Sequence, residues 1–166
     1  MLIYHPVFDT NHSMFRMLRL LEATPGKSLR WDAFRILDFY YLFPHLLGSA
    51  RLPRGLTAAK QRYGKMDARY NKVPSPRVFI QQLAGLHELV ARSLVGKGFL
   101  AADAFGKNTL RRTETPLPPS LTEAFIGGDD QALVDLLATK MAAIPLNGPD
   151  GLKDRTGLLE YRYDAV

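Results

Sequence analysis

The stretch "AFRILDFYYLFPHLLG", residues 33–48, is the most apolar in the chain and decides how the rest is organised. Eleven of its first fifteen residues are aliphatic or aromatic. A membrane span needs about 20 mostly apolar residues with few charges, whereas this run contains Arg35 and Asp38 and is broken by Pro44. The stretch therefore predicts a helix buried in the core of a protein that does not cross a membrane.

The flanking residues predict where this helix begins and ends. Ser28 is a good N-cap, and Pro44 disfavours helical geometry in the residue before it, so we expect the helix to stop near Phe43. Arg35 and Asp38 are spaced to form an ion pair across one turn. A helix that is apolar on nearly all sides is usually buried, but aromatic residues also suit contacts with a partner protein. The candidates for a partner interface are Tyr40, Tyr41, Phe43 and His45.

Length and composition are those of an ordinary globular protein with a sizeable core. The chain has 166 residues, of which 46% are hydrophobic and 23% charged. It has no cysteine, which excludes disulfides, thiolate zinc sites and cysteine nucleophiles. The N-terminal "MLIYHPVFD" has neither a basic leader nor a cleavage-site pattern. We therefore expect a cytoplasmic protein.

The net charge of +6 is distributed unevenly along the chain. Residues 1–50 carry five Lys/Arg and four Asp/Glu, residues 51–112 carry thirteen and three, and residues 113–166 carry four and nine. A basic middle beside an acidic last third indicates a polyanionic partner. The candidates for contacts with nucleic acid are Arg51, Arg54, Lys60, Arg62, Lys65, Arg69, Lys72, Arg77, Lys107, Arg111 and Arg112.

Local signals predict three further helices in the first hundred residues. Candidate caps for a helix that continues to "LLEA" are Asp9, Thr10, Asn11 and Ser13, and a short helix is expected over 57–63. Ser75 and Pro76 are typical of an N-cap and a first helical residue, and Gly96 is a typical C-terminal stop. Together these residues predict a long helix after the basic segment.

The segment "GFLAADAFGKNTLRRT", residues 98–113, predicts a β-hairpin, because Gly-Lys-Asn separates two short segments. A buried helix followed by a basic hairpin is the order of elements at the end of a winged helix-turn-helix domain. Further on, "SLTE" at 120–123 matches a capping box, 129–144 predicts a helix, and 157–166 alternates as a strand does.

The expected fold class is therefore α+β and mostly helical. Residues 1–113 would form a winged-helix-like core domain with the basic hairpin. Residues 114–166 would form a C-terminal appendage of helix and strand, packed on the same domain.

No enzyme motif stands out. The chain lacks the glycine-rich phosphate-binding patterns and the nucleophile elbow. His5, Asp9 and His12 contain the donor atoms for a metal ion, but their spacing does not fit a helical metal site, and Asp9 has a simpler use as a helix cap. We expect no catalytic residues, no cofactor and no metal.

Two strings resemble a known family when they are taken together. "YHPVFDTNHSMFRMLRLLE" at 4–22 and "RILDFYYLFPHLL" at 35–47 resemble the type-five middle component of the ABC-three-component systems, bacterial anti-phage systems related to Lamassu. The resemblance implies a small non-enzymatic subunit with a winged-helix-like core. It would bridge or regulate an SMC-like ABC ATPase and an effector subunit, with double-stranded DNA as a further contact.

Two alternatives remain open at this stage. A free-standing winged-helix transcriptional regulator would use the same basic face to bind DNA, as a symmetric dimer. A metal-dependent enzyme would be built on His5, Asp9 and His12.

Overall fold

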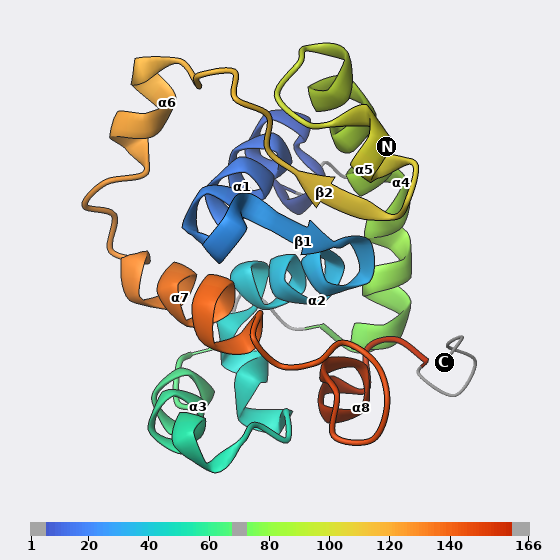
Figure 1. Cartoon of the computed structure of the whole chain (residues 1–166). Coiled ribbons are helices and arrows are strands. Elements are labelled where there is room, and N and C mark those ends of the chain that lie inside the picture. The colour runs from blue at the N-terminus through green and yellow to red at the C-terminus, as the bar shows by residue number, and fades with distance from the viewer. Residues whose placement is uncertain (1–5, 68–72, 161–166) are drawn as a thin grey trace, which may run out of the picture.

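In the computed structural model, helix α2 (Trp31–Leu42) lies at the centre of the molecule, with helices on several sides (Figure 1). The structure describes residues 6–67 and 73–160. Among these residues, helices predominate, and the one sheet has two antiparallel strands. The predicted class, α+β and mostly helical, is confirmed.

Helix α1 (Thr10–Ala23) begins where its sequence predicts. The Asp9 carboxylate accepts a hydrogen bond from the backbone N–H of His12 at 2.8 Å, which satisfies one of the unpaired donors of the first turn. Short 3-10 helices precede and follow α1, at Pro6–Phe8 (η1) and Pro25–Lys27 (η2).

Helix α2 begins two residues later than predicted, with Arg30 and not Ser28 at its N-cap. Strand β1 (Ser28–Arg30) occupies these residues and pairs with β2 (Thr109–Arg111), with Leu29 opposite Leu110. Both leucines are buried, so the pairing closes one side of the core. The end of α2 at Leu42, two residues before Pro44, agrees with the prediction.

The hairpin predicted over 98–113 exists only in part. This segment contains the short helix α5 (Ala102–Phe105) followed by β2, and the partner strand of β2 is β1. The two ends of the segment also pair antiparallel at a bridge between Leu100 and Arg112, where the Ala101 N–H donates to the Arg111 carbonyl at 2.9 Å and the Thr113 N–H donates to the Phe99 carbonyl at 3.1 Å. The winged-helix arrangement therefore stays a prediction.

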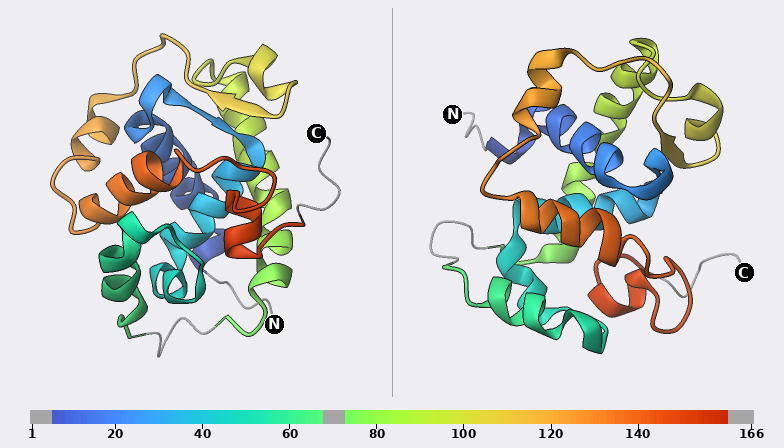
Figure 2. Two further views of the ribbon diagram at one scale, coloured as in Figure 1. Left: turned by 60° about the horizontal axis from the view of Figure 1, so that its bottom comes forward. Right: turned by 60° about the vertical axis from the view of Figure 1, so that its left-hand side comes forward.

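Helix α3 (Thr57–Gly64) lies at one end of the molecule, as both figures show (Figures 1 and 2). It follows the 3-10 helices η3 (Pro44–Ser49) and η4 (Arg54–Leu56) and packs against η3. A Cβ added to Gly48 would lie 2.9 Å from the Gly64 Cα, closer than real Cβ atoms approach backbone. The two glycines therefore permit this backbone contact.

Helix α4 (Pro76–Gly96) has the bounds that its sequence predicts, although the Ser75 side chain makes no capping bond. Its buried side includes Ile80, Leu83 and Leu94.

The last third adds α6 (Pro119–Ala124), α7 (Gln131–Asp135), a π-helical continuation η5 (Leu136–Met141), and α8 (Leu152–Thr156). The capping box is wrong, because α6 begins at Pro119 and places Ser120 inside the helix. The helix predicted over 129–144 exists in part as α7 and η5. Residues 157–160 form no strand, and the rest of that prediction, 161–166, lies outside the described residues.

The core is continuous across the chain. Leu137 and Met141 of η5 belong to the same cluster of buried side chains as Leu20, Phe34 and Leu110. No helix in the described part of the chain combines the length and the apolar character that crossing a membrane requires.

Candidate functional site

A charged cluster lies at the centre of the core, where α1, α2 and α4 meet. Arg16 donates from Nε to Asp38 Oδ1 at 2.7 Å and from Nη2 to Oδ2 at 3.1 Å. His87 Nε2 lies 2.8 Å from Asp38 Oδ2. All three side chains are 0% exposed. The sequence-based pair of Arg35 with Asp38 is wrong, because Asp38 points to Arg16 and His87.

The electrostatics of this cluster explain how a carboxylate tolerates full burial. Burial raises the pKa of Asp38, but the charge of Arg16 and the hydrogen bond of His87 outweigh burial and lower it to about 2. An ionised carboxylate only accepts hydrogen bonds, so His87 Nε2 is the donor. An Asp–His pair also orients general bases in enzymes, but this pair has no surface that a substrate can reach.

Arg35 has other partners on the edge of the core. Its Nη1 donates to Asp32 Oδ1 at 3.2 Å, and Asp32 Oδ2 lies 3.0 Å from Lys153 Nζ of α8. Asp32 thus joins α2 to the C-terminal part of the chain.

A second cluster joins α1 and α2 to the start of α7. Arg19 Nη1 donates to Asp130 Oδ1 at 2.7 Å and to the Tyr41 hydroxyl at 2.9 Å. The Tyr41 hydroxyl donates to Asp130 Oδ2 at 2.9 Å. Burial and the hydrogen bond to Asp130 raise the pKa of Tyr41 to about 12. Asp130 therefore uses its side chain for a tertiary contact, and it makes no cap hydrogen bond to α7.

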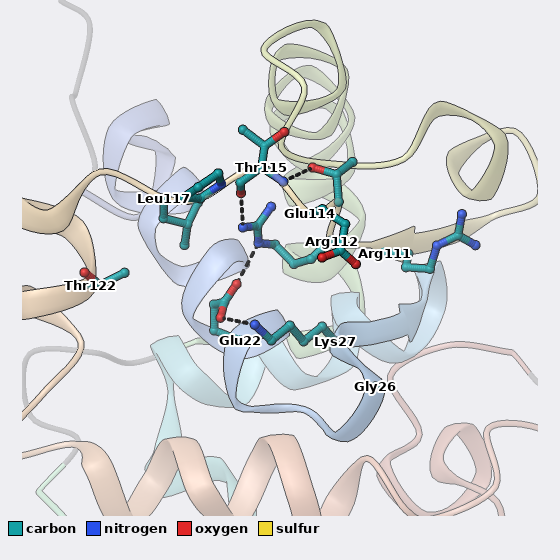
Figure 3. A pocket seen from close by; sticks show the side chains of 11 residues that line it. Glu22, Gly26, Lys27, Arg111, Arg112, Glu114, Thr115, Leu117 and Thr122 are labelled. Atoms are coloured by element: carbon teal, nitrogen blue, oxygen red, sulfur yellow. Dashed lines mark hydrogen bonds and ion pairs between the residues drawn. The ribbon is translucent and has the colours of Figure 1, made fainter.

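A third cluster lies in a pocket of about 770 Å³ beside the sheet (Figure 3). Arg112 Nε donates to Glu22 Oε1 at 2.7 Å, and Lys27 Nζ lies 2.9 Å from Glu22 Oε2. Arg112 also donates to the carbonyls of Phe99 and Thr115. Burial raises the pKa of Glu22, but Lys27 and Arg112 more than offset this and hold it below its usual value. Figure 3 shows Arg112 between Glu22 and Thr115.

The structure divides the eleven nucleic-acid candidates into three groups. Four have carboxylate partners: Arg51 with Asp150 and Asp154, Arg77 with Glu160, Arg111 with Asp103, and Arg112 with Glu22. Five form no ion pair within the part of the chain that the structure describes, and these are Arg54, Lys60, Arg62, Lys65 and Lys107. Arg69 and Lys72 lie outside the described residues.

The chain is similar to one known protein family over nearly all of its length. The model of the family described as ABC-three component (ABC-3C) system Middle Component 5 matches residues 2–164, nearly the whole chain. The chain belongs to this family. Neither the curated proteins nor the solved structures contain a match. The resemblance seen in the sequence is therefore confirmed as far as the ABC-three-component middle component.

The predicted partner-interface residues of this middle component differ in exposure. Tyr40 and Phe43 are each 2% exposed and pack inside the core. Tyr41 is half-buried and bonded to Asp130, and His45 is half-buried with a pKa lowered by burial. Of the four, Tyr41 and His45 retain surface for a partner.

The middle component also has a groove that its sequence did not indicate. The groove has a volume of about 600 Å³ and lies between the end of α2, α3 and the start of α7. Its walls combine apolar side chains with charges of both signs: Tyr41, Leu42, Pro44, Arg62, Tyr63, Met66, Asp129, Asp130 and Leu133. These residues come from three separate stretches, so no local pattern reveals the groove.

The proposed metal ligands are used differently or not described. Asp9 caps α1, and His12 Nδ1 lies 2.6 Å from Arg16 Nη1. His5 lies outside the described residues. Across 6–67 and 73–160, no three His, Asp or Glu side chains are grouped as metal ligands.

Proposed function

We propose that this middle component is a non-enzymatic assembly subunit of a Lamassu-related bacterial anti-phage system, where it bridges an SMC-like ABC ATPase and an effector subunit. The observation that carries the proposal is the family match over residues 2–164. A middle component of a three-component system has two other components as its natural partners, and a bridging role follows most simply from that position.

The way in which the chain uses its ionisable groups supports a structural role. The central Asp38–His87 pair is inaccessible, and the cluster of Arg19, Tyr41 and Asp130 ties three helices together. Catalytic groups usually lie in a cleft with access for substrate. Here the most perturbed carboxylate is part of the core.

Contact with double-stranded DNA is the second part of the proposal. The specific observation in its favour is the set of five basic candidates that form no ion pair within the described residues. Cations without carboxylate partners remain available to phosphates, which attract them over a range set by salt.

The deciding experiment is affinity purification of the tagged protein from its native host, with and without nuclease, followed by mass spectrometry. We expect an SMC-like ATPase and an effector subunit to co-purify and to survive nuclease. Recovery of DNA alone, lost on nuclease treatment, would overturn the subunit proposal and favour a free-standing DNA-binding regulator. The control is the same purification with an unrelated tagged protein.

A further inference from the structure

We infer that helix α3, together with the η4 turn before it, is the element that binds double-stranded DNA, with its exposed side in the major groove and its flanking cations on phosphates. This inference rests on the DNA contact proposed above. It assigns that contact to one end of the molecule and removes the strand β2 from it.

The segment around α3 carries only positive charge. Residues 39–66 contain five Lys/Arg and no Asp or Glu. Arg54 lies in η4, Lys60 and Arg62 lie in α3, and Lys65 follows directly. None of these four is in an ion pair with a described carboxylate.

The two arginines at the end of β2 differ in this respect, and Lys107 is the one candidate of that region that is in no ion pair with a described carboxylate. Arg111 donates to both oxygens of Asp103, at 3.0 and 3.1 Å. Arg112 is 4% exposed at its side chain and bonded to Glu22. Either arginine would have to lose a carboxylate partner before it bound a phosphate. The basic hairpin predicted over 98–113 is therefore a poorer site for DNA than α3.

The exposed side of α3 has a shape that suits the major groove. Its solvent-facing residues are small or polar: Thr57, Ala58 and Gln61 are all exposed. The major groove is about 12 Å wide and admits a helix, and small side chains let the backbone approach the base edges. Gln61 supplies an amide, the group that pairs with adenine in the major groove.

Helix α3 is fixed to the core and to η3. Tyr63 is 7% exposed and belongs to the core, and Gly64 touches Gly48 of η3 through backbone. Figure 2 shows α3 at one end of the molecule, and the helix packs against η3. A rigid helix that protrudes at one end presents its side chains in a fixed register.

An acidic protein is the competing partner, and the exposed side of α3 suits it less well. Protein interfaces depend on a few large aromatic or aliphatic anchors. Within α3 the outer residues include none, and its one tyrosine is buried; Met66, which follows Lys65, is the single large apolar side chain exposed beside the helix. The charge and small side chains of α3 fit a phosphate backbone better.

The test compares two triple variants of the full chain that remove the same charge. Lys60→Gln/Arg62→Gln/Lys65→Gln neutralises the α3 cations, and Arg51→Gln/Arg77→Gln/Arg111→Gln neutralises three exposed arginines that have carboxylate partners. Fluorescence anisotropy measures binding to a short mixed-sequence DNA duplex at several salt concentrations. Circular dichroism verifies that both variants are folded.

We expect the α3 variant to lose about tenfold or more in affinity for the duplex. The slope of log K against the logarithm of the salt concentration should become less steep by about three. The control variant should bind within about twofold of wild type. Equal binding by the α3 variant and wild type, or a larger loss in the control variant, would overturn the inference.

The same variants separate this inference from the proposed function. If the α3 variant binds DNA normally but no longer co-purifies with the ATPase or effector, α3 is a protein contact and the inference is wrong while the assembly proposal stands. If the wild type binds no duplex, the DNA contact itself fails, and nuclease-resistant co-purification still decides the assembly proposal.

Discussion

At the scale of single residues, the central carboxylate shows why local spacing does not decide an ion pair. Arg35 lies three residues from both Asp32 and Asp38, and both spacings allow a pair on a helix. The structure pairs Arg35 with Asp32, because Asp38 faces inward and is bound there by Arg16 and His87. By contrast, the Asp9 cap was predictable, since its partner, the His12 N–H, is fixed by the helix itself.

The first residue-scale prediction concerns Asp38→Asn. The change leaves the Arg16 guanidinium buried without a carboxylate, so the free energy of unfolding should fall by roughly 3–5 kcal/mol. Urea denaturation at neutral pH measures the loss. The matched control is Asp103→Asn, which breaks a solvent-exposed pair with Arg111 and should lower the free energy of unfolding far less than Asp38→Asn does. Similar losses for the two variants would contradict a special role for the central cluster.

The pH dependence follows from the same carboxylate. Its pKa is about 2 in the folded protein and 3.8 for the ordinary group, so below pH ~5 the unfolded chain binds the proton first. The stabilisation by Asp38 is therefore complete above that pH and is lost as pH falls through 3.8 toward 2. We expect the difference in unfolding free energy between wild type and Asp38→Asn to shrink by about 2 kcal/mol over this range. A difference that stays constant with pH would contradict the assigned pKa.

At the scale of elements, the packing of α3 on η3 depends on two glycines. A Cβ on Gly64 would lie 3.0 Å from the Gly48 Cα, and one on Gly48 would lie 2.9 Å from the Gly64 Cα. Both neighbours are backbone, which cannot move without shifting a whole element. The short helix over 57–63 was predictable from its sequence, but its close approach to residue 48 was not.

Gly64→Ala should lower the free energy of unfolding by about 1–3 kcal/mol, because the added methyl separates α3 from η3. Gly85→Ala in α4 is the matched control: nothing lies within 4 Å of its Cβ position, and alanine favours the helix by about 0.5–1 kcal/mol. The midpoint temperatures of thermal denaturation of the two variants should therefore shift in opposite directions relative to wild type. A Gly64→Ala protein that is as stable as wild type would show that the glycine contact is unimportant.

At the scale of the whole molecule, the last third packs into the core formed by the first two thirds. Leu137 and Met141 are 0% exposed and share one cluster with residues of α1 and α2. Ion pairs also cross between the parts, from Arg19 to Asp130 and from Arg51 to Asp154. The acidic last third therefore neutralises part of the basic charge within the same molecule, which reduces the charge that a partner meets.

Leu137→Ala tests whether the parts unfold together. The lost contacts and the cavity should cost about 2–5 kcal/mol. The single tryptophan, Trp31, lies at the start of α2, far from residue 137 in sequence, and packs near Phe34 and Phe105. We expect Trp31 fluorescence and far-ultraviolet circular dichroism to report the same lowered midpoint. A fluorescence midpoint that stays at the wild-type value would mean that residues 114–166 unfold separately.

The sequence by itself determined the features that depend on a few neighbouring residues and on composition. Asp9, Pro76 and Gly96 set helix ends because caps and prolines act on adjacent backbone, and the apolar run at 33–48 set the buried helix. The strings at 4–22 and 35–47 pointed to the family that matches residues 2–164.

Only the tertiary structure decided the features that join distant parts of the chain. Strand β1 pairs with β2 across almost eighty residues, where the local turn signal favoured a hairpin. The partners of Asp38, and the division of the basic residues into those with and without carboxylates, follow from which surfaces the core brings together. The physical reason is that a charge or a strand edge takes the partner that the packed core places within reach, and sequence spacing predicts that partner only within one or two helical turns.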